Sequence, residues 1–521
     1  MSVRVRYAPS PTGMQHIGGV RTALFNYLFA RSQGGSFILR LEDTDRTRYD
    51  EAYVQNLYDT LNWLGIEWDE GGEKAGDYGP YVQSERFDLY KKAADELIAK
   101  GEAYHCFCNE ERLSALRTEQ IEKKSSVLGY DRHCRELSDD EVKKRLASGE
   151  KSVIRLKIPL TGETHFQDAL LGDISWKNSD MSPDPVLLKT DGFPTYHLAN
   201  VVDDHYMQIS HVMRAQEWIP STPLHVRMYH SFGWEAPVFC HLPMVNGSDG
   251  QKLSKRHGAT NMNEFRSRGY LPQAIINYVA MLGCSYEEGR DLFPLEDLER
   301  LFKIEHLNKA GAVFDYKKLE WFNGQYIRLL SDEALLEKTL PFITGTGDAL
   351  LPIHASDAFP APHMGPEYSG ISMKEDGSLI AANMNDAEIR AKLLSLMPLI
   401  KERLSYLTEA AEKVAFIFKP LPEISKEALI PKKLDECKTK EVLSGARDFI
   451  RELFLLDEAE QEQLPKSYAE KLGVKLGDFM MPLRIALTAS KVSPPLVGSI
   501  IALGEKEALL RLEKSIALLS C

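Results

Sequence analysis

The chain has 521 residues, 43% of them hydrophobic, with seven cysteines and a formal net charge of −13. This length supports several domains with their own cores, and the composition is typical of a soluble globular protein in which no stretch is apolar enough for a membrane helix. The negative charge excludes a uniformly basic nucleic-acid binder, so any RNA site must be a basic stripe on an acidic body.

The first stretch combines a strand, a tight loop and a helix start. Residues 3–7 alternate in character and predict a strand. Pro9, Pro11 and Gly13 then predict a stiff turn, and apolar residues recur at helical spacing from Val20. His16 is therefore expected at a helix mouth, where backbone N–H groups and the helix dipole attract anions such as a triphosphate. The loop matches neither G-x-x-x-x-G-K-[ST] nor G-x-G-x-x-G, and a turn that merely contains a histidine is the alternative.

Residues 1–100 alternate strand and helix patterns, which indicates a parallel sheet. A buried strand is predicted at 37–41, with helices at about 52–64 and 86–99. From residue 101 the pattern changes to a charged helical stretch followed by an alternating strand at 152–158. We interpret 101–190 as an insertion between two halves of one fold. The second half is predicted from a helix opening in 193–204 and a strand with a turn at 211–218.

Beyond about residue 323 the strand patterns fade. Long amphipathic helices are predicted at 387–418, 440–455 and 505–519. Between about 344 and 382 lies a stretch rich in Gly, Pro and His, which predicts an irregular loop or a small appendage.

A basic run, Lys252-Leu253-Ser254-Lys255-Arg256, follows the turn-forming run 246–250. Cations on a mobile loop can close over a leaving pyrophosphate, although such a run alone is typical of a solvated loop. Paired with residues 16–19 (HIGG), it resembles the HIGH and KMSKS motifs of class I aminoacyl-tRNA synthetases. Residues 8–13 (APSPTG) and 41–46 (LEDTDR) narrow the resemblance, over essentially the whole chain, to the bacterial-type glutamyl-tRNA synthetases. Gly19 stands where the class motif has its second histidine.

This resemblance implies an α/β fold with a Rossmann-type parallel-sheet catalytic domain in two parts, 1–100 and 191–240. The insertion 101–190 would be an α+β acceptor-binding domain, and 241–322 a stem-contact domain that carries the KLSKR loop. Residues 323–521 would form an all-α anticodon-binding region of two subdomains with a break near 420. The run 473–484 is the clearest match in that region.

The implied activity is that of a glutamate–tRNA ligase. It would activate L-glutamate with ATP to glutamyl-adenylate, transfer the acyl group to the 3′-terminal ribose of tRNA(Glu), and release AMP and diphosphate. The alternative within this chemistry is a non-discriminating enzyme that also glutamylates tRNA(Gln). A small-molecule nucleotidyltransferase and a catalytically silent RNA-binding paralogue are the rivals from other classes.

Glutamate brings two carboxylates and one ammonium, so two arginines and an acid are the matching set. Arg6, Glu42 and Arg214 are expected at strand ends, where open α/β sheets bind ligands; a surface ion pair is the alternative for each. The resemblance implies three groups of residues. The catalytic ones are His16, Lys252 and Lys255; those that bind glutamate are Arg6, Ser10, Glu42, Tyr196, Asn200 and Arg214; those that bind ATP are His16, Gly18, Glu217, Trp218, Met244, Val245 and Lys255.

Magnesium and zinc are the candidate metals. Magnesium, held mainly by the ATP phosphates, is the expected ion. Cys106-x-Cys108 and Tyr130-x-x-x-Cys134 resemble the zinc knuckle of some relatives, which implies Cys106, Cys108, Tyr130 and Cys134 as Zn²⁺ ligands, with His133 competing for the fourth position. Free cysteines in a reducing cytosol are the alternative.

The expected partners are tRNA(Glu), L-glutamate and ATP, with no membrane and a monomeric state. The chain starts directly with a strand pattern, from which we expect no secretory signal. The cysteines lack an even, closely spaced framework, which favours a reducing compartment. The expected location is the cytoplasm.

Overall fold

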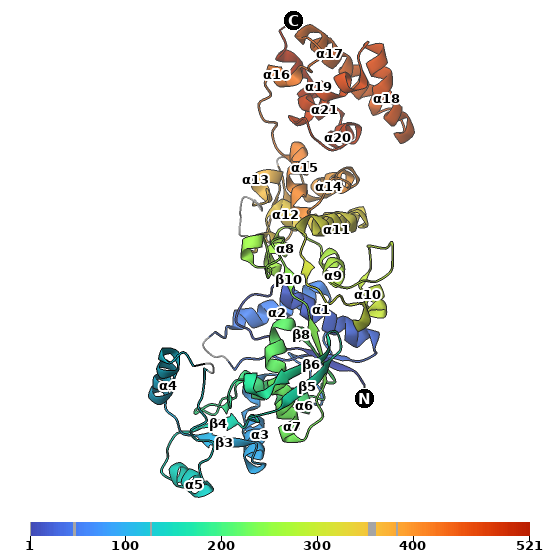
Figure 1. Cartoon of the computed structure of the whole chain (residues 1–521). Helices are drawn as coiled ribbons and strands as arrows, with labels where there is room; N and C mark the ends of the chain where they lie inside the picture. Colours follow the sequence, from blue (N-terminus) through green and yellow to red (C-terminus); the bar gives the residue numbers. More distant parts are fainter. Residues whose placement is uncertain (1, 45–47, 126–127, 353–360, 382–383, 521) are drawn as a thin grey trace. The chain divides into compact units, whose positions relative to one another are not determined.

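The computed structural model describes residues 2–44, 48–125, 128–352, 361–381 and 384–520, and it describes Lys255 without its side chain (Figure 1). Contacts divide the chain into two units. The first unit comprises residues 1–262 and 276–315, and the second comprises 263–275 and 316–521. Among the described residues, no helix has the length and apolar character needed to cross a bilayer.

The first unit is built around parallel strands. Strand β1 (Arg4–Tyr7) pairs with β2 (Ser36–Leu39), and β8 (His211–Ala215) pairs with β9 (Val238–Leu242), both in parallel. The backbone N–H of Ser210 donates to the carbonyl of Arg4 at 2.9 Å, which places β8 beside β1. The predicted parallel sheet is therefore present. Its strands are short and almost wholly buried, as expected where helices cover the faces.

Helices connect these strands, mostly where the periodicity predicts them; the last of them, residues 222–232, is not among the predicted helices. They are α1 (Ile17–Ser32), α2 (Glu51–Leu64), α3 (Phe87–Ala99), α6 (Tyr196–Tyr206) and α7 (Thr222–Phe232). Local chemistry fixes their ends. In α2, the Asp50 carboxylate accepts from the N–H of Ala52, and Gly65 ends the helix at φ 74°, a left-handed conformation that glycine adopts without strain. Fully buried side chains such as Tyr90, Leu97 and Leu198 join α3 and α6 into one core.

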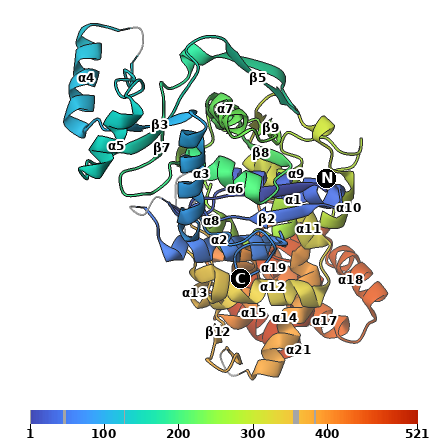
Figure 2. The same cartoon turned by 90° about the horizontal axis from the view of Figure 1, so that it is seen from below.

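The stretch 101–190 contributes to two sheets. Strands β3 (Ala103–Cys106), β4 (Val153–Leu156) and β7 (Val186–Leu188) form an antiparallel sheet, accompanied by α4 (Glu110–Glu122) and α5 (Asp139–Ala147). In Figure 2, α4 and α5 lie on the side of this sheet away from β2. The hairpin of β5 (Glu163–Asp168) and β6 (Gly172–Lys177) instead extends the sheet of β8 and β9, through the parallel pairing Asp168↔Phe239. The hairpin thus brings an inserted residue, Asp168, against β9.

Short elements complete the first unit. Strand β10 (Val245–Asn246) pairs in parallel with β11 (Ala312–Val313), and the turn η4 (Lys255–His257) begins within the basic run. Helix α10 (Leu295–Leu301) contacts α1. Helices α8 (Met262–Ser267) and α9 (Pro272–Ala280) connect the two units along the chain.

The second unit is helical, as predicted. Its first part contains α11 (Tyr316–Arg328), α12 (Asp332–Thr344), α13 (Pro366–Ser369), α14 (Asp386–Lys401) and α15 (Ala410–Phe418). The rest contains α16 (Lys426–Leu429), α17 (Glu436–Leu453), α18 (Glu458–Lys471), α19 (Leu476–Thr488), α20 (Leu496–Leu503) and α21 (Glu505–Ala517).

In two places the structure of this unit adds detail that the sequence did not predict. The predicted helix 387–418 is two helices, because Glu409 accepts hydrogen bonds from the backbone N–H groups of Ser405 and Tyr406 and starts a new helical segment there. The stretch 344–382 holds α13 and a small hairpin of β12 (Ser372–Met373) and β13 (Leu379–Ile380). Residues 353–360 and 382 of this stretch lie outside the described residues.

Candidate active site

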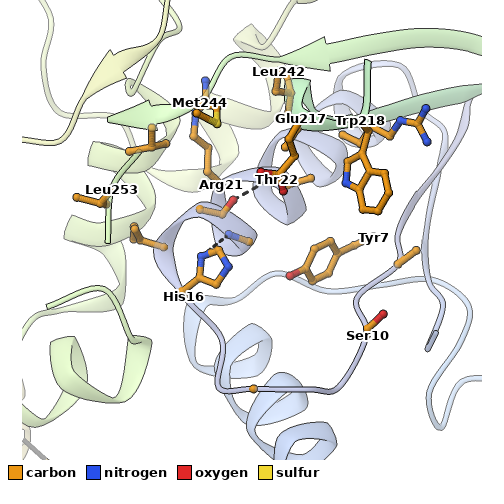
Figure 3. Close-up of a pocket in the computed structure, with 18 of the residues that line it drawn as sticks. Tyr7, Ser10, His16, Arg21, Thr22, Glu217, Trp218, Leu242, Met244 and Leu253 are labelled. Atoms are coloured by element: carbon orange, nitrogen blue, oxygen red, sulfur yellow. Dashed lines mark hydrogen bonds between the residues drawn. The ribbon is translucent and has the colours of Figure 1, made fainter. Parts of the chain in front are cut away.

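A cavity of about 770 Å³ opens in the first unit at the carboxyl ends of β1 and β8 and at the start of α1 (Figure 3). Ligands of open α/β sheets bind at this edge. Most of the residues predicted for the site line this one cavity. They are Arg6, Ser10, His16, Gly18, Glu42, Tyr196, Asn200, Arg214, Glu217, Trp218, Met244, Val245 and Lys252.

His16 is the N-cap of α1. Its Nδ1 accepts a hydrogen bond from the backbone N–H of Gly19 at 3.2 Å. The ring proton therefore resides on Nε2, which can donate to a ligand. Desolvation at the cavity wall, reinforced by the nearby Lys252, lowers the pKa of His16, so the ring is neutral at neutral pH. The structure thus places a neutral imidazole donor at the positive end of a helix dipole, an arrangement suited to phosphate oxygens.

Gly19 has a steric reason to be glycine. A Cβ built at this position would lie 2.8 Å from the hydroxyl of Tyr7, which itself donates to Oε1 of Gln15 at 2.9 Å. A second histidine, which the class motif carries here, would collide with that hydroxyl. Sequence reasoning did not identify Tyr7, although it lies on the first predicted strand and lines the cavity.

The segment that follows the basic run is connected to the His16 loop by backbone hydrogen bonds. The N–H of Ile17 donates to the carbonyl of Thr260 at 2.9 Å, and the N–H of Met262 donates to the carbonyl of Gln15 at 3.0 Å. Lys252 Nζ donates to Oε2 of Glu217 at 2.6 Å in an exposed pair. Such a pair contributes little to stability and can exchange partners readily. The predicted role of Lys255 concerns a side chain outside the described part of the chain.

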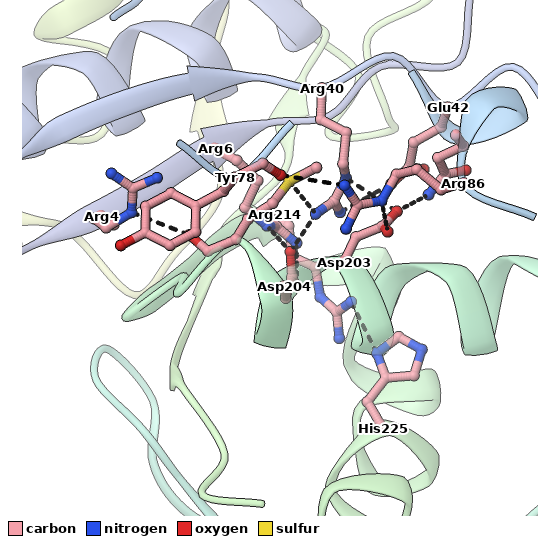
Figure 4. Close-up of polar contacts among 12 residues, drawn as sticks. Arg4, Arg6, Arg40, Glu42, Tyr78, Arg86, Asp203, Asp204, Arg214 and His225 are labelled. Atoms are coloured by element: carbon pink, nitrogen blue, oxygen red, sulfur yellow. Dashed lines mark hydrogen bonds and ion pairs between the residues drawn. The ribbon is translucent and has the colours of Figure 1, made fainter. Parts of the chain in front are cut away.

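Arg6 and Arg40 are both neutralised by acids inside the protein (Figure 4). Arg6 donates from Nε and Nη2 to the two carboxylate oxygens of Asp204 at 2.9 and 3.2 Å. Arg40, which is fully buried, donates to Asp204 at 2.6 Å and to Glu42 at 3.2 Å. Burial alone would raise the pKa of Asp204, but Arg6 and Arg40 outweigh burial and hold this pKa below its usual value. Arg6 therefore already has a carboxylate partner, which the sequence did not reveal.

Arg214 is buried but has uncharged partners among the described residues (Figure 4). It donates to Nε2 of His241 at 3.2 Å and to Nδ1 of His225 at 3.2 Å. It also donates to Oγ1 of Thr222 at 2.8 Å and lies 3.4 Å from the hydroxyl of Tyr196. Burial lowers the pKa of Arg214, yet a guanidinium remains charged at neutral pH. A buried charge with neutral partners favours an anionic ligand beside it.

Aromatic rings and backbone groups shape the rest of the cavity. The rings of Tyr196 and Trp218 lie 4.5 Å apart, and burial raises the pKa of Tyr196 to about 12, which keeps its hydroxyl protonated. The carbonyl of Met244 accepts from the N–H of Ala312 at 3.2 Å. Arg21, another residue not predicted, donates to the carbonyl of Pro243 at 2.7 Å and fixes the chain just before Met244.

The predicted zinc ligands also come together, away from this cavity. The Sγ atoms of Cys106, Cys108 and Cys134 all lie within 4.8 Å of one another, and Cys108 and Cys134 are 3.6 Å apart. The Tyr130 hydroxyl lies 3.2 Å from Sγ of Cys106 and 3.9 Å from Sγ of Cys108. Tetrahedral Zn²⁺ with bonds of about 2.3 Å to sulfur separates its ligand atoms by roughly 3.5–3.8 Å. The donor set fits such an ion, whereas His133 is exposed.

Comparisons with known proteins match the whole chain. Residues 2–321 match the family model for the catalytic domain of class I tRNA synthetases (E and Q), and residues 364–516 match an anticodon binding domain. The chain is 58% identical to the glutamate–tRNA ligase of Treponema denticola, over 99% of each protein, and 48% identical to that of Borrelia recurrentis, over 99% of this chain and 95% of the relative.

A solved structure agrees with these relatives. The fold is similar to that of a glutamate tRNA ligase from Elizabethkingia meningosepticum in complex with its amino acid, with a TM-score of 0.81 and 34% identity over the full length of both chains. This match confirms the predicted Rossmann-type catalytic part and helical C-terminal half. The chain belongs to the bacterial-type glutamate–tRNA ligases, the class I aminoacyl-tRNA synthetases that use ATP to join glutamate to tRNA.

Proposed function

We propose that the cavity between β1, β8 and α1 is where L-glutamate reacts with ATP to give glutamyl-adenylate. The acyl group would then pass to the 3′-terminal ribose of tRNA(Glu). The observation that carries this proposal is the pairing, in one cavity, of a buried guanidinium with neutral partners (Arg214) and an imidazole donor at a helix N-terminus (His16). The first suits the amino acid's carboxylate, and the second suits the triphosphate.

Glutamate would bind at the Arg214 end. Its side-chain carboxylate would take N–H donors from Arg214 and Arg6 and the hydroxyl of Tyr196, because charge-assisted hydrogen bonds are the strongest available to it. The α-ammonium would lie near Glu42, which Arg40 already positions. Ser10 and Asn200, on the same cavity wall, would complete the contacts to the amino-acid backbone.

ATP would bind at the His16 end. His16 Nε2 would donate to a phosphate oxygen, while Gly18 leaves the backbone open to the nucleotide. Met244 and Val245 would lie beside adenine, and Glu217 and Trp218 near the ribose. When the ribose engages Glu217, Lys252 would be released to follow the phosphates, since the exposed pair that holds it is weak.

The chemical step needs positioning and charge stabilisation. An oxygen of the glutamate α-carboxylate attacks the α-phosphorus of ATP in line, and the bond to pyrophosphate breaks. His16, Lys252 and Lys255 would stabilise the charge that moves onto the leaving group. In the second step the ribose hydroxyl attacks the acyl carbon, and AMP leaves.

Mg²⁺ would enter with ATP. The carboxylates described at the cavity, Glu42 and Glu217, each bond a cation already. They do not form an acidic pair that would hold Mg²⁺ by themselves, and this ion generally binds to proteins together with substrate phosphates. It would supply charge neutralisation on the phosphates.

We propose a structural Zn²⁺ at Cys106, Cys108, Cys134 and Tyr130. It would fix the β3 end against the loop 130–134 and take no part in the reaction. Elemental analysis of the purified protein tests this: one zinc per chain is expected, and Cys134→Ser should remove it. Metal-free protein after purification without chelators would refute the site, and a metal content unchanged in Tyr130→Phe would exclude the phenol as a ligand.

The second unit would bind the anticodon side of tRNA(Glu), because residues 364–516 match an anticodon binding domain. The substrates, tRNA, ATP and glutamate, are cytoplasmic molecules, and we place the enzyme there. The decisive experiment is aminoacylation with glutamate, ATP and Mg²⁺ on purified tRNA(Glu) and, separately, tRNA(Gln). We expect charging of tRNA(Glu). Protein that charges neither tRNA would refute the proposed function.

A further inference from the structure

The described partners of Arg214 form a collar of neutral acceptors. His225 contributes Nδ1 from α7, His241 contributes Nε2 from β9, and Thr222 contributes Oγ1 from the first turn of α7. His225, His241 and Thr222 are buried. A guanidinium group can only donate hydrogen bonds, so both imidazoles must accept at these nitrogens.

This requirement fixes the protons on His225 and His241 and makes Nδ1 of His197 an acceptor. His225 carries its proton on Nε2 and donates to Nδ1 of His197, 3.0 Å away. His241 carries its proton on Nδ1 and donates to Oδ2 of Asp168 at 2.6 Å. A second proton on His225 or His241 would set an N–H against the N–H of Arg214. The collar therefore holds Arg214 only while both rings are neutral.

Asp168 determines how His241 faces Arg214. Its Oδ1 accepts from the backbone N–H groups of Leu170 and Leu171 at 3.0 and 2.8 Å, and its Oδ2 accepts from the backbone and ring N–H groups of His241. The carboxylate is thus saturated and ionised, and it reaches Arg214 only through the full width of the His241 ring. Asp168 orients the collar without neutralising the guanidinium.

The contrast with the neighbouring arginines indicates what the collar does. Arg6 and Arg40 are oriented by Asp204, and their charge is compensated by it. Arg214 is oriented just as firmly, but by groups that leave its charge intact. A carboxylate at the position of either imidazole would orient Arg214 equally well and would cancel the charge that an anionic ligand needs.

We propose that His225 and His241 are positioning residues that set the preference for glutamate over glutamine by holding Arg214 without neutralising it. This inference rests on the proposed function, in which Arg214 binds the side-chain carboxylate of glutamate. Glutamine, whose side chain ends in an uncharged amide, gains little from the intact charge. The collar thereby leaves Arg214 able to distinguish a ligand with a charged side chain from one with an uncharged side chain.

A matched pair of variants at position 225 isolates the charge. In His225→Asn the amide oxygen can accept from Arg214 as Nδ1 does, and His225→Asp differs from it only in carrying a negative charge. We expect the KM for glutamate in tRNA(Glu) charging to be about tenfold to hundredfold higher in His225→Asp than in His225→Asn, the range for loss of a charge-assisted hydrogen bond. The KM for ATP should differ less than about threefold between the two.

The inhibition constant of glutamine separates an effect of the charge from a general disturbance of the structure. As a competitive inhibitor, glutamine should have nearly the same Ki in both variants, because the binding of its uncharged side-chain amide depends little on a negative charge beside Arg214. Equal KM values for glutamate in the two variants would overturn the inference, and so would a parallel rise in the KM for glutamate and the Ki for glutamine. Failure of the unsubstituted enzyme to charge tRNA(Glu) would instead refute the proposed function.

Two substitutions at position 241 form a second, independent pair of matched variants. His241→Gln places an amide oxygen near the position of Nε2, and His241→Glu adds the charge there. If His225→Asp does not fold, as judged by its thermal transition, the same comparison is made with this pair. The expected and the contradicting results are the same as at position 225.

Discussion

Asp204 is the carboxylate whose removal should disturb the site most clearly. In Asp204→Asn the two guanidinium groups of Arg6 and Arg40 lose the charge that lies between them. Three charge-assisted hydrogen bonds end on this carboxylate, at 2.6, 2.9 and 3.2 Å, and its side chain is 2% exposed. An amide keeps one acceptor and turns an N–H₂ group toward a cation. Breaking a buried pair in this way costs about 3–5 kcal/mol.

Thermal unfolding of the full-length chain measures this loss. One kcal/mol shifts the midpoint of a unit of this size by about 2 °C, so the transition of the first unit should fall by about 6–10 °C. That transition is recognised because glutamate and ATP raise it. The matched control is Glu96→Gln, which breaks the exposed pair with Lys100 and should change stability by less than about 1 kcal/mol.

Equal falls of the midpoint in Asp204→Asn and Glu96→Gln would contradict a neutralising role of Asp204. Such a result would mean that water or a neighbouring group compensates Arg6 and Arg40 without Asp204. Arg6 and Arg40 would then not differ from Arg214 in how their charge is compensated.

Three further predictions test other parts of the site. His16→Asn keeps a cap acceptor for Gly19 but removes the Nε2 donor, so kcat should fall by about 10²–10³ while the KM for glutamate stays the same; an unchanged kcat would remove His16 from the mechanism. Gly19→Ala should destabilise the first unit by about 1–3 kcal/mol, because the new methyl group would collide with the Tyr7 hydroxyl. Adding Tyr7→Phe should restore most of the lost stability. A double variant as unstable as Gly19→Ala would show that the clash lies elsewhere. Burial lowers the pKa of His197 to about 4 from 6.5. As the pH falls, the unfolded chain therefore binds a proton at this histidine before the folded chain does. The free energy of unfolding should drop by about 2 kcal/mol from pH 7 to pH 5 and should keep falling toward pH 4. Midpoints recorded against pH for the native chain and His197→Asn check this, since the variant should show a shallower fall.

Local patterns predicted the parts of the site that lie on single elements. The alternation of residues 3–7 and the helical spacing from Val20 located β1 and α1, and therefore His16 at the helix start. The turn-forming run before Lys252 located the second loop. These features depend on near neighbours in sequence, which is why one sequence was enough to find them.

The partners of the site arginines could not be found in this way. Asp204 is 198 residues from Arg6, and its sequence context is an ordinary helix in which an acid is usually exposed. His225 and His241 lie on a helix and a strand with no motif around them. Only the tertiary packing shows that these polar residues are buried and what they contact.

The inserted hairpin shows how such packing connects distant parts of the chain at this site. Asp168 lies in a stretch expected to form a separate domain, yet β5 pairs with β9 and brings its carboxylate to His241. A change in the insertion that shifts β5 by one residue would turn Asp168 to the opposite face of the strand, because side chains alternate. His241 would then lose the acceptor that fixes its tautomer. If the collar sets the preference for glutamate, that preference depends on the register of a strand that does not itself line the cavity.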